Sequence, residues 1–212
     1  RGVFAAARNI TERKRAEEAL RLNESRLEAL LRLNQMTRQP LREITKFALE
    51  EGIRLTGSQV GYLAFASEDE TELTMHAWSQ EAMRQCGIQD KPLLYRVAET
   101  GLWGEAVRQR RPVITNDYDA APVKKGYPPG HVPITRHMNL PIFDGGRIVA
   151  VAGVGNKAAE YDESDVRQLT LLMEGMWRMV QRQRAEADLQ RQATLLHLAP
   201  AAILVRDRLS RI

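Results

Sequence analysis

Two apolar runs, Met138–Phe143 and Arg147–Val154, are separated only by Asp144-Gly145-Gly146. Glycine reaches the positive φ values that a tight hairpin turn needs, so two glycines between apolar runs are a strong hairpin signal. A second pair of strand-like runs, Val60–Ala66 and Glu72–Ser79, is joined by the short polar stretch SEDET. Because hairpins join antiparallel strands, the sheet is predicted to be mainly antiparallel.

Helical patterns lie on both sides of these strands. One helix is predicted over Leu41–Thr56, and Gly57 after it is a natural residue to end a helix. A long helix is predicted from near Asp162 to about Leu198. The shorter pieces are predicted helices at Ser79–Cys86 and Gly101–Arg110 and a strand at Pro112–Thr115. The order of elements predicts an α+β fold with helices packed on the sheet.

Both terminal regions carry a heptad pattern, which predicts long coiled-coil-like helical extensions. In residues 11–37 the pattern begins at Ala16, and in the last helix it begins at Met173 and becomes polar further on. Two interpretations stay open: a seam between two chains in a homodimer, or amphipathic helices that pack on their own domain. The residues expected in the dimer seam are Leu20, Asn23, Leu27, Leu30, Asn34, Met176, Val180 and Ala187.

Charge argues against a nucleic-acid partner. The net charge of +4 comes from residues 1–38, whereas residues 39–184 carry a net −1 and residues 185–212 a net +1. The predicted globular part therefore lacks the basic excess of a nucleic-acid-binding surface. No apolar run is long enough to cross a membrane and no signal peptide is visible, so we expect no membrane contact. The single cysteine rules out an internal disulfide and favours a cytoplasmic location.

Several segments together resemble a GAF domain, over residues 39–184. They are VGYLAFA, ELTMHAWS, GLWGEAVRQRRPVITNDY, LPIFDGGRIVAVAGVGNK and the closing helix. The resemblance implies a six-stranded antiparallel sheet, with the N- and C-terminal helices on one face and a ligand pocket on the other.

Both ends show a second resemblance. GVFAAARNITERKRAEEALR is similar to the last strand and exit helix of a PAS domain, which covers residues 1–38. LLHLAPAAILVRDRLSRI is similar to the opening of another PAS domain, so residues 185–212 are expected to hold a signalling helix and that opening. The arrangement is typical of bacterial sensors, and it implies an output domain outside this sequence, either a histidine kinase or a diguanylate cyclase.

No catalytic set is visible, so we expect no enzymatic activity in this sequence. Gly145-Gly146 is a turn and not a cyclase signature, and GVGNK lacks the helix that follows a phosphate-binding loop. The four histidines lack metal-ligand spacing, so no metal is expected.

Cys86 has several possible roles. GAF domains that attach a bilin often have a histidine directly after the cysteine, and Gly87 stands there, so no covalent bilin is expected and the cofactor is unknown. Methionine-sulfoxide reductases of this family use more than one cysteine, and one is too few for their disulfide relay. A small, partly buried structural residue and a redox-sensing thiol both stay open.

The segment of residues 124–141, KKGYPPGHVPITRHMNLP, is too rich in proline for a helix or an interior strand. By the resemblance it crosses the pocket face. An arginine suits an anionic ligand, and tryptophans supply a flat apolar wall. Alternatively, Asn116 and Asp117 close a turn, Arg136 pairs with Asp117, and the tryptophans are core. The candidate ligand contacts are Trp78, Cys86, Trp103, Asn116, Asp117, Tyr127, His131, Arg136 and His137.

Asn156, Lys157, Tyr161 and Asp165 resemble a motif of cyclic-nucleotide-binding GAF domains, with Tyr161 in place of Phe and Val166 in place of Glu. We interpret Lys157 and Asp165 as a structural ion pair that ties the last strand to the last helix.

The sequence thus favours a non-catalytic sensory module that binds a small molecule and relays the signal through dimeric helices to neighbouring PAS and output domains. The alternatives are a dimerisation spacer without ligand and a cofactor-based light or redox sensor.

Overall fold

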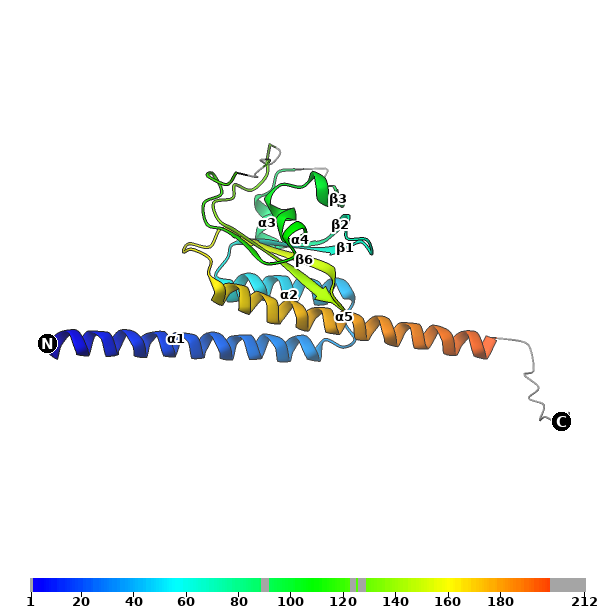
Figure 1. Cartoon of the computed structure of the whole chain (residues 1–212). Coiled ribbons are helices and arrows are strands. Elements are labelled where there is room, and N and C mark those ends of the chain that lie inside the picture. Colours follow the sequence, from blue (N-terminus) through cyan, green and yellow to red (C-terminus); the bar gives the residue numbers. More distant parts are fainter. Residues whose placement is uncertain (1, 89–91, 123–124, 126–128, 199–212) are drawn as a thin grey trace. The chain divides into compact units, whose positions relative to one another are not determined.

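The computed structural model describes residues 2–88, 92–122, 125 and 129–198, and it divides the chain into two compact units, Arg1–Met179 and Val180–Ile212. The first unit contains a six-stranded sheet in which neighbouring strands run antiparallel (Figure 1). The strand order is β3-β2-β1-β6-β5-β4. The strands are β1 (Val60–Ala66), β2 (Glu72–Trp78), β3 (Leu94–Arg96), β4 (Val113–Thr115), β5 (His137–Asp144) and β6 (Arg147–Gly155). The predicted α+β fold with an antiparallel sheet is confirmed.

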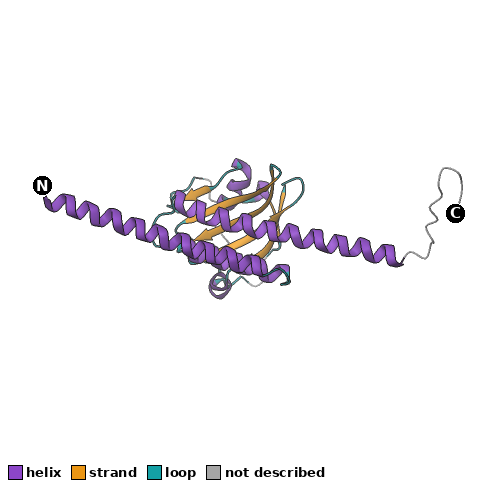
Figure 2. Ribbon diagram, turned by 90° about the horizontal axis from the view of Figure 1, so that it is seen from below, coloured by secondary structure: helices purple, strands orange, loops and turns teal. Residues whose placement is uncertain are grey.

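Helices cover both faces of this sheet. The long ones, α1 (Gly2–Gln35), α2 (Leu41–Thr56) and the part of α5 (Glu163–Leu198) up to residue 179, lie on one side (Figure 2). The short ones lie on the other side: α3 (Gln80–Gln85) and α4 (Glu105–Gln109), with the 3₁₀ turns η1 (Val97–Glu99) and η2 (Leu102–Gly104).

A glycine allows α2 and α5 to touch closely. A Cβ at Gly52 would lie 2.7 Å from the Cδ1 atom of Leu169 and 3.2 Å from the Cε atom of Met173. The neighbouring side chains Ile44 and Leu49 of α2 are fully buried. Apolar burial of this kind is the main favourable term in folding, and it anchors the two helices to the sheet.

The hairpin between β5 and β6 turns through Gly145 and Gly146, which have φ angles of 56° and 83°. These left-handed values are easily reached only by glycine. Asp144 at the start of the turn accepts a hydrogen bond from the indole N–H of Trp177, at 3.3 Å. The turn of the sheet is thereby linked to α5.

Helix α1 begins at Gly2, so residues that were expected to form the exit strand of a PAS domain are helical. A strand needs a partner to satisfy its backbone groups, whereas a helix satisfies them within itself. The alanine-rich sequence FAAAR also favours the helix.

The predicted seam residues divide between two environments. Ala29 and Leu33 are buried, so α1 packs on its own unit, and a Cβ at Gly175 of α5 would lie 2.8 Å from the Cδ2 atom of Leu30. Leu20 and Leu27 are exposed, and so is the neighbouring Leu31; Leu27 is 61% exposed.

The other seam residues lie as follows. Asn23, Asn34 and Ala187 are exposed, and the Nδ2 atom of Asn34 donates to the Leu30 carbonyl of its own helix. Met176 and Val180 are buried within the chain, so the expectation that these two residues form a seam between chains is wrong. Within the described ranges, no helix is both long and apolar enough to cross a membrane.

Candidate functional site

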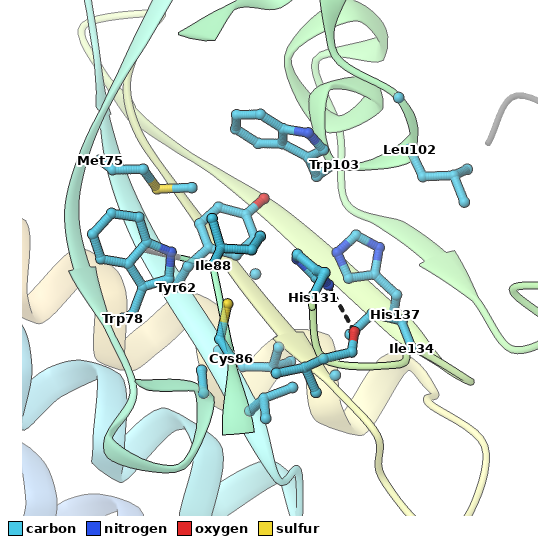
Figure 3. Close-up of a pocket in the computed structure, with 18 of the residues that line it drawn as sticks. Tyr62, Met75, Trp78, Cys86, Ile88, Leu102, Trp103, His131, Ile134 and His137 are labelled. Atoms are coloured by element: carbon cyan, nitrogen blue, oxygen red, sulfur yellow. Dashed lines mark hydrogen bonds between the residues drawn. The ribbon is translucent and has the colours of Figure 1, made fainter. Parts of the chain in front are cut away.

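A pocket of about 430 Å³ lies on the side of the sheet that faces α3 and η2 (Figure 3). Successive residues of β1 face opposite sides of the sheet. Gly61 packs against Ile53 of α2, whereas Val60 and Tyr62, on either side of Gly61, line the pocket on the other face. The volume is within the range of small-molecule sites. Its lining residues are Val60, Gly61, Tyr62, Met75, Trp78, Ala82, Cys86, Ile88, Pro92, Tyr95, Gly101, Leu102, Trp103, Tyr118, His131, Val132, Ile134, His137, Gly153, Val154 and Gly155.

Aromatic rings form much of the wall. Trp103 meets Tyr62 edge to face, with ring centroids 5.7 Å apart, and meets Tyr95 in the same way at 4.9 Å. Trp78 and Met75 of β2 add apolar surface beside Tyr62. Edge-to-face contacts stabilise aromatic clusters beyond the burial of their area, so these rings form a fixed wall.

The ring of Tyr62 lies over a glycine of the neighbouring strand. A Cβ at Gly153 would lie 2.1 Å from the Cε1 atom of Tyr62 and 2.6 Å from the Oδ1 atom of Asn139. The Tyr62 hydroxyl donates to that same Oδ1 atom at 2.7 Å. Burial raises the pKa of Tyr62 far above its usual range, so the hydroxyl keeps its proton.

Two histidines line the pocket and hold their protons on different nitrogens. The Nδ1 atom of His131 lies 2.7 Å from the carbonyl oxygen of Val132, and a carbonyl only accepts, so Nδ1 carries the proton. The Nδ1 atom of His137 lies 3.3 Å from the Nδ2 atom of Asn139, and an amide nitrogen only donates, so this Nδ1 carries the lone pair. Burial, and next the charge of His131, lower the pKa of His137 to about 4. His137 is therefore neutral at neutral pH.

Cys86 follows α3 and lies at the pocket wall, half-buried, where it packs against the cluster of Val60, Ala82 and Val132 (Figure 3). Its backbone N–H donates to the carbonyl of Ala82 at 3.0 Å. Burial, and next the electrostatic interaction with Cys86, raise the pKa of Tyr95. Within the part of the chain that the structure describes, no cluster of three or more His, Cys, Asp and Glu side chains could hold a metal ion.

Five of the nine candidate ligand contacts line this pocket: Trp78, Cys86, Trp103, His131 and His137. Two others, Asn116 and Asp117, make contacts elsewhere. Asn116 accepts from the backbone N–H of Tyr161 at 2.8 Å and donates to its carbonyl at 3.0 Å. Asp117 accepts from the N–H of Ala120 at 3.0 Å, which closes a turn. Tyr127 is outside the described residues.

Arg136 was expected near a ligand or beside Asp117. Its Nη1 atom instead lies 3.4 Å from the carbonyl oxygen of Lys157, and its Nε atom is buried with no hydrogen-bond partner among the described residues. Arg136 is not among the pocket-lining residues.

The segment that crosses the pocket is held in place by Asn156. This residue has a φ angle of 62°, a conformation that asparagine tolerates better than most residues. Its Oδ1 atom accepts from the N–H of Thr135 at 2.9 Å, and its Nδ2 atom donates to the carbonyl of Pro133 at 2.8 Å. On the other side, the N–H of Gly87 donates to the carbonyl of Gly130 at 2.8 Å. The segment is thereby bonded at both ends to the body of the domain.

Lys157 and Asp165 lie together, with Nζ 2.5 Å from Oδ2. Asp165 is buried and also accepts from the N–H of Asp162 at 3.0 Å, near the start of α5. The pair joins the end of β6 to α5, away from the pocket.

Sequence reasoning did not name the pocket-lining tyrosines Tyr62, Tyr95 and Tyr118 as candidates, nor Asn139, which accepts the hydrogen bond of the Tyr62 hydroxyl. The sequence does point to Asn139. It is the one amide in the apolar run HMNLPIF, and a buried amide costs free energy unless it has hydrogen-bond partners. Tyr62 lies in the nearly all-apolar run VGYLAFA, where its position on the pocket face follows from strand alternation.

Comparison with known proteins agrees with the family resemblance of the sequence. A family model described as "GAF domain" matches residues 38–181. The "Methyl sulfide methyltransferase-associated sensor" of the archaeon Methanosarcina acetivorans is 62% identical over 189 residues, which is 89% of this chain. The chain spans about a fifth (19%) of that relative's length. The expected link to bacterial sensors therefore receives no support from this relative.

Two solved structures share the fold at low identity. The GAF domain of a phosphoenolpyruvate-protein phosphotransferase from Coxiella burnetii has a TM-score of 0.63 and 16% identity, covering 78% of this chain and 98% of that one. A free methionine-R-sulfoxide reductase from Neisseria meningitidis, in complex with its substrate, has a TM-score of 0.59 and 15% identity, covering 76% and 91%.

Proposed function

Because the chain belongs to the GAF domain family, we propose that it is a sensory module that binds a small molecule and performs no catalysis of its own. The observation that carries this proposal is the pocket of about 430 Å³, which is walled by aromatic rings on the face of the sheet away from α2 and α5. A spacer that serves only for dimerisation has no need of such a cavity. The name of the 62% identical relative, a sensor, agrees with this function.

The lining favours a largely apolar molecule that carries few polar groups. Trp78, Trp103 and Met75 offer flat or adaptable apolar contacts. His131 and His137 supply polar atoms on the other wall. Small-molecule sites commonly combine an apolar lining with a few polar groups that fix the orientation of the ligand.

The polar groups are arranged for binding and not for a redox relay. Cys86 is the single cysteine of these 212 residues, so no second thiol among them can resolve an oxidised Cys86. The Tyr62 hydroxyl already donates to Asn139, and burial holds its proton in place.

Signal relay is proposed to pass through the sheet to α5. The Trp177 ring meets Phe65 of β1 edge to face at 5.9 Å, and its N–H donates to Asp144 in the hairpin turn. A ligand shifts the helices only if it binds two helix arrangements with different affinity. We propose that neighbouring PAS domains and a histidine kinase or diguanylate cyclase receive this signal.

Dimerisation is proposed to use the exposed side of α1. At 100° per residue, Leu20, Leu27 and Leu31 lie on one stripe, opposite the buried Ala29 and Leu33. A second copy of this chain that lays its own stripe against this one would bury all three leucines, as in a parallel coiled coil.

An NMR titration tests binding at the pocket. We choose 2-naphthoate as the probe because it combines an aromatic ring system with one polar group. The indole N–H signals of Trp78 and Trp103 should shift on its addition, whereas a pocket filled by Met75→Trp should respond at least tenfold more weakly. Unchanged indole signals at millimolar probe would contradict the proposal.

A second function, a cofactor-based light or redox sensor, is favoured by one observation. Cys86, His131 and His137 line the same pocket, and a thiol and imidazoles are groups that can attach or hold a cofactor. Visible absorbance of protein purified from its native source tests this: a band that is lost in Cys86→Ser supports it, and colourless protein argues against it.

A further inference from the structure

Asn139 links three groups at the base of the pocket, and its own amide has only one possible orientation. Its Oδ1 atom lies 2.7 Å from the Tyr62 hydroxyl. Its Nδ2 atom lies 3.3 Å from the carbonyl oxygen of Leu102, and a carbonyl only accepts, so this amide atom must be the nitrogen. Asn139 is fully buried, and its amide nitrogen has two protons to donate.

The second proton of the Asn139 amide determines which ring nitrogen of neutral His137 is protonated. The Nδ1 atom of His137 lies 3.3 Å from the same Nδ2 atom and accepts from it. A neutral imidazole whose Nδ1 accepts carries its proton on Nε2. Asn139 therefore selects one of the two neutral tautomers of the ring.

His137 is placed to present this N–H to the pocket. It lies on β5 opposite Gly155 of β6, and both residues line the pocket. The side chain is 9% exposed, and its ring stands beside that of His131 at the pocket wall (Figure 3). Because His137 lines the pocket, a bound molecule that offers an oxygen acceptor to this N–H gains affinity there.

We propose that Asn139 is a positioning residue that holds the proton of His137 on Nε2, so that this N–H donates to a carbonyl or carboxylate oxygen of the bound molecule. This inference rests on the proposed function and adds to it the class of polar group that the ligand carries. The lowered pKa of His137 supports it, since a ring that stays neutral keeps the same single donor across the physiological pH range.

The first test reads the tautomer directly, without any ligand. Long-range ¹H–¹⁵N correlation spectra of the histidine-labelled chain distinguish a protonated from an unprotonated ring nitrogen. We expect an unprotonated Nδ1 and a protonated Nε2 at His137 at pH 7.5. In Asn139→Asp, the carboxylate can only accept, so Nδ1 should become protonated. A protonated Nδ1 in the unsubstituted chain would overturn the inference.

The second test measures affinity with two matched probes, 2-naphthoate and naphthalene, which share the rings and differ in the carboxylate. We expect the unsubstituted chain to prefer 2-naphthoate, and we expect His137→Phe to reduce that preference about tenfold. His137→Gln keeps an N–H donor and should restore part of the preference. Melting curves of each variant confirm that it is folded.

The outcomes separate this inference from the proposed function. If both probes bind and the preference is the same in His137→Phe, the pocket binds small molecules but the donor role is wrong. If neither probe binds the unsubstituted chain, the proposed function and the donor role are both contradicted.

Discussion

The phenol ring of Tyr62 occupies the space that a side chain at Gly153 would need. A Cβ at Gly153 would come within 2.1 Å of that ring, far inside van der Waals contact. The glycine on β6 thus allows the tyrosine on β1 to lie flat across the sheet, where its hydroxyl reaches Asn139. One missing side chain therefore sets the position of an aromatic wall and of the hydrogen bonds behind it.

Gly153→Ala should force the Tyr62 ring out of place and lower the free energy of unfolding by about 1–3 kcal/mol, as overpacking of a core does. Urea denaturation measures this. Gly87→Ala is the matched control, because a Cβ there meets only backbone atoms at 3.7 Å and 3.9 Å, so its change should stay within about 0.5 kcal/mol. Equal changes in the two variants would contradict this role of Gly153.

Acid should weaken the fold through His137. Its pKa in the folded chain is about 4, below the ordinary value of 6.5, because burial disfavours the charged ring. The unfolded chain thus binds a proton more readily between these values, so stability is full above pH 6.5 and falls as pH drops towards 4. The loss is up to about 3 kcal/mol for this one group.

Comparison with His137→Gln isolates that contribution, because an amide does not titrate in this range. The free energy of unfolding, measured by denaturant at several pH values, should fall less for His137→Gln than for the unsubstituted chain between pH 6.5 and 4.5. Parallel curves would show that His137 contributes nothing to the acid sensitivity.

Asp165→Asn should destabilise the fold by about 2 kcal/mol, because it removes the partner of the mostly buried Lys157 ammonium group. The control is Glu163→Gln in the exposed first turn of α5, for which a change of less than about 0.5 kcal/mol is expected. Thermal unfolding measures both, and a smaller loss in Asp165→Asn than in the control would refute the structural role.

Leu27→Glu combined with Leu31→Glu should shift the chain from dimer to monomer in sedimentation, because like charges would face each other in the buried stripe. Arg21→Glu changes the charge of an exposed residue off that stripe and should leave the dimer intact. If the double variant sediments as the unsubstituted chain does, the proposed dimer through α1 is wrong.

Periodicity predicted the elements of the fold well where the pattern was long or bounded by glycine. The helix predicted over Leu41–Thr56 and the strand predicted over Val60–Ala66 have those bounds in the structure. The helix at 41–56 ends at Gly57, which has a φ angle of 64°. Glycine adopts this left-handed conformation readily, which is why it marked the end of the helix in the sequence.

Short edge elements could not be predicted in the same way. β3 has three residues, Leu94–Arg96, and it forms because β2 offers free backbone groups next to it. Its sequence, LYR, has no periodicity to detect. Such strands depend on tertiary contacts and not on local pattern.

Only part of the pocket lining could be predicted, because the contacts of the remaining candidates depend on the tertiary structure. Aromatic, thiol and imidazole side chains could be chosen from the sequence because their chemistry suits ligand binding. Five of the nine candidate ligand contacts, all of these types, line the pocket. Asn116 and Arg136 bond to backbone atoms that are distant in the sequence, at Tyr161 and Lys157. Only the folded chain brings those partners together.

Native mass spectrometry of the chain, purified without denaturation from its native source, tests the central claim most directly. If the chain is a small-molecule sensor, the unsubstituted protein should carry an additional mass of small-molecule size, and the pocket-filled variant Met75→Trp should not. A spectrum of bare polypeptide for both proteins, even after incubation with 2-naphthoate, would contradict the claim and favour a dimerisation spacer.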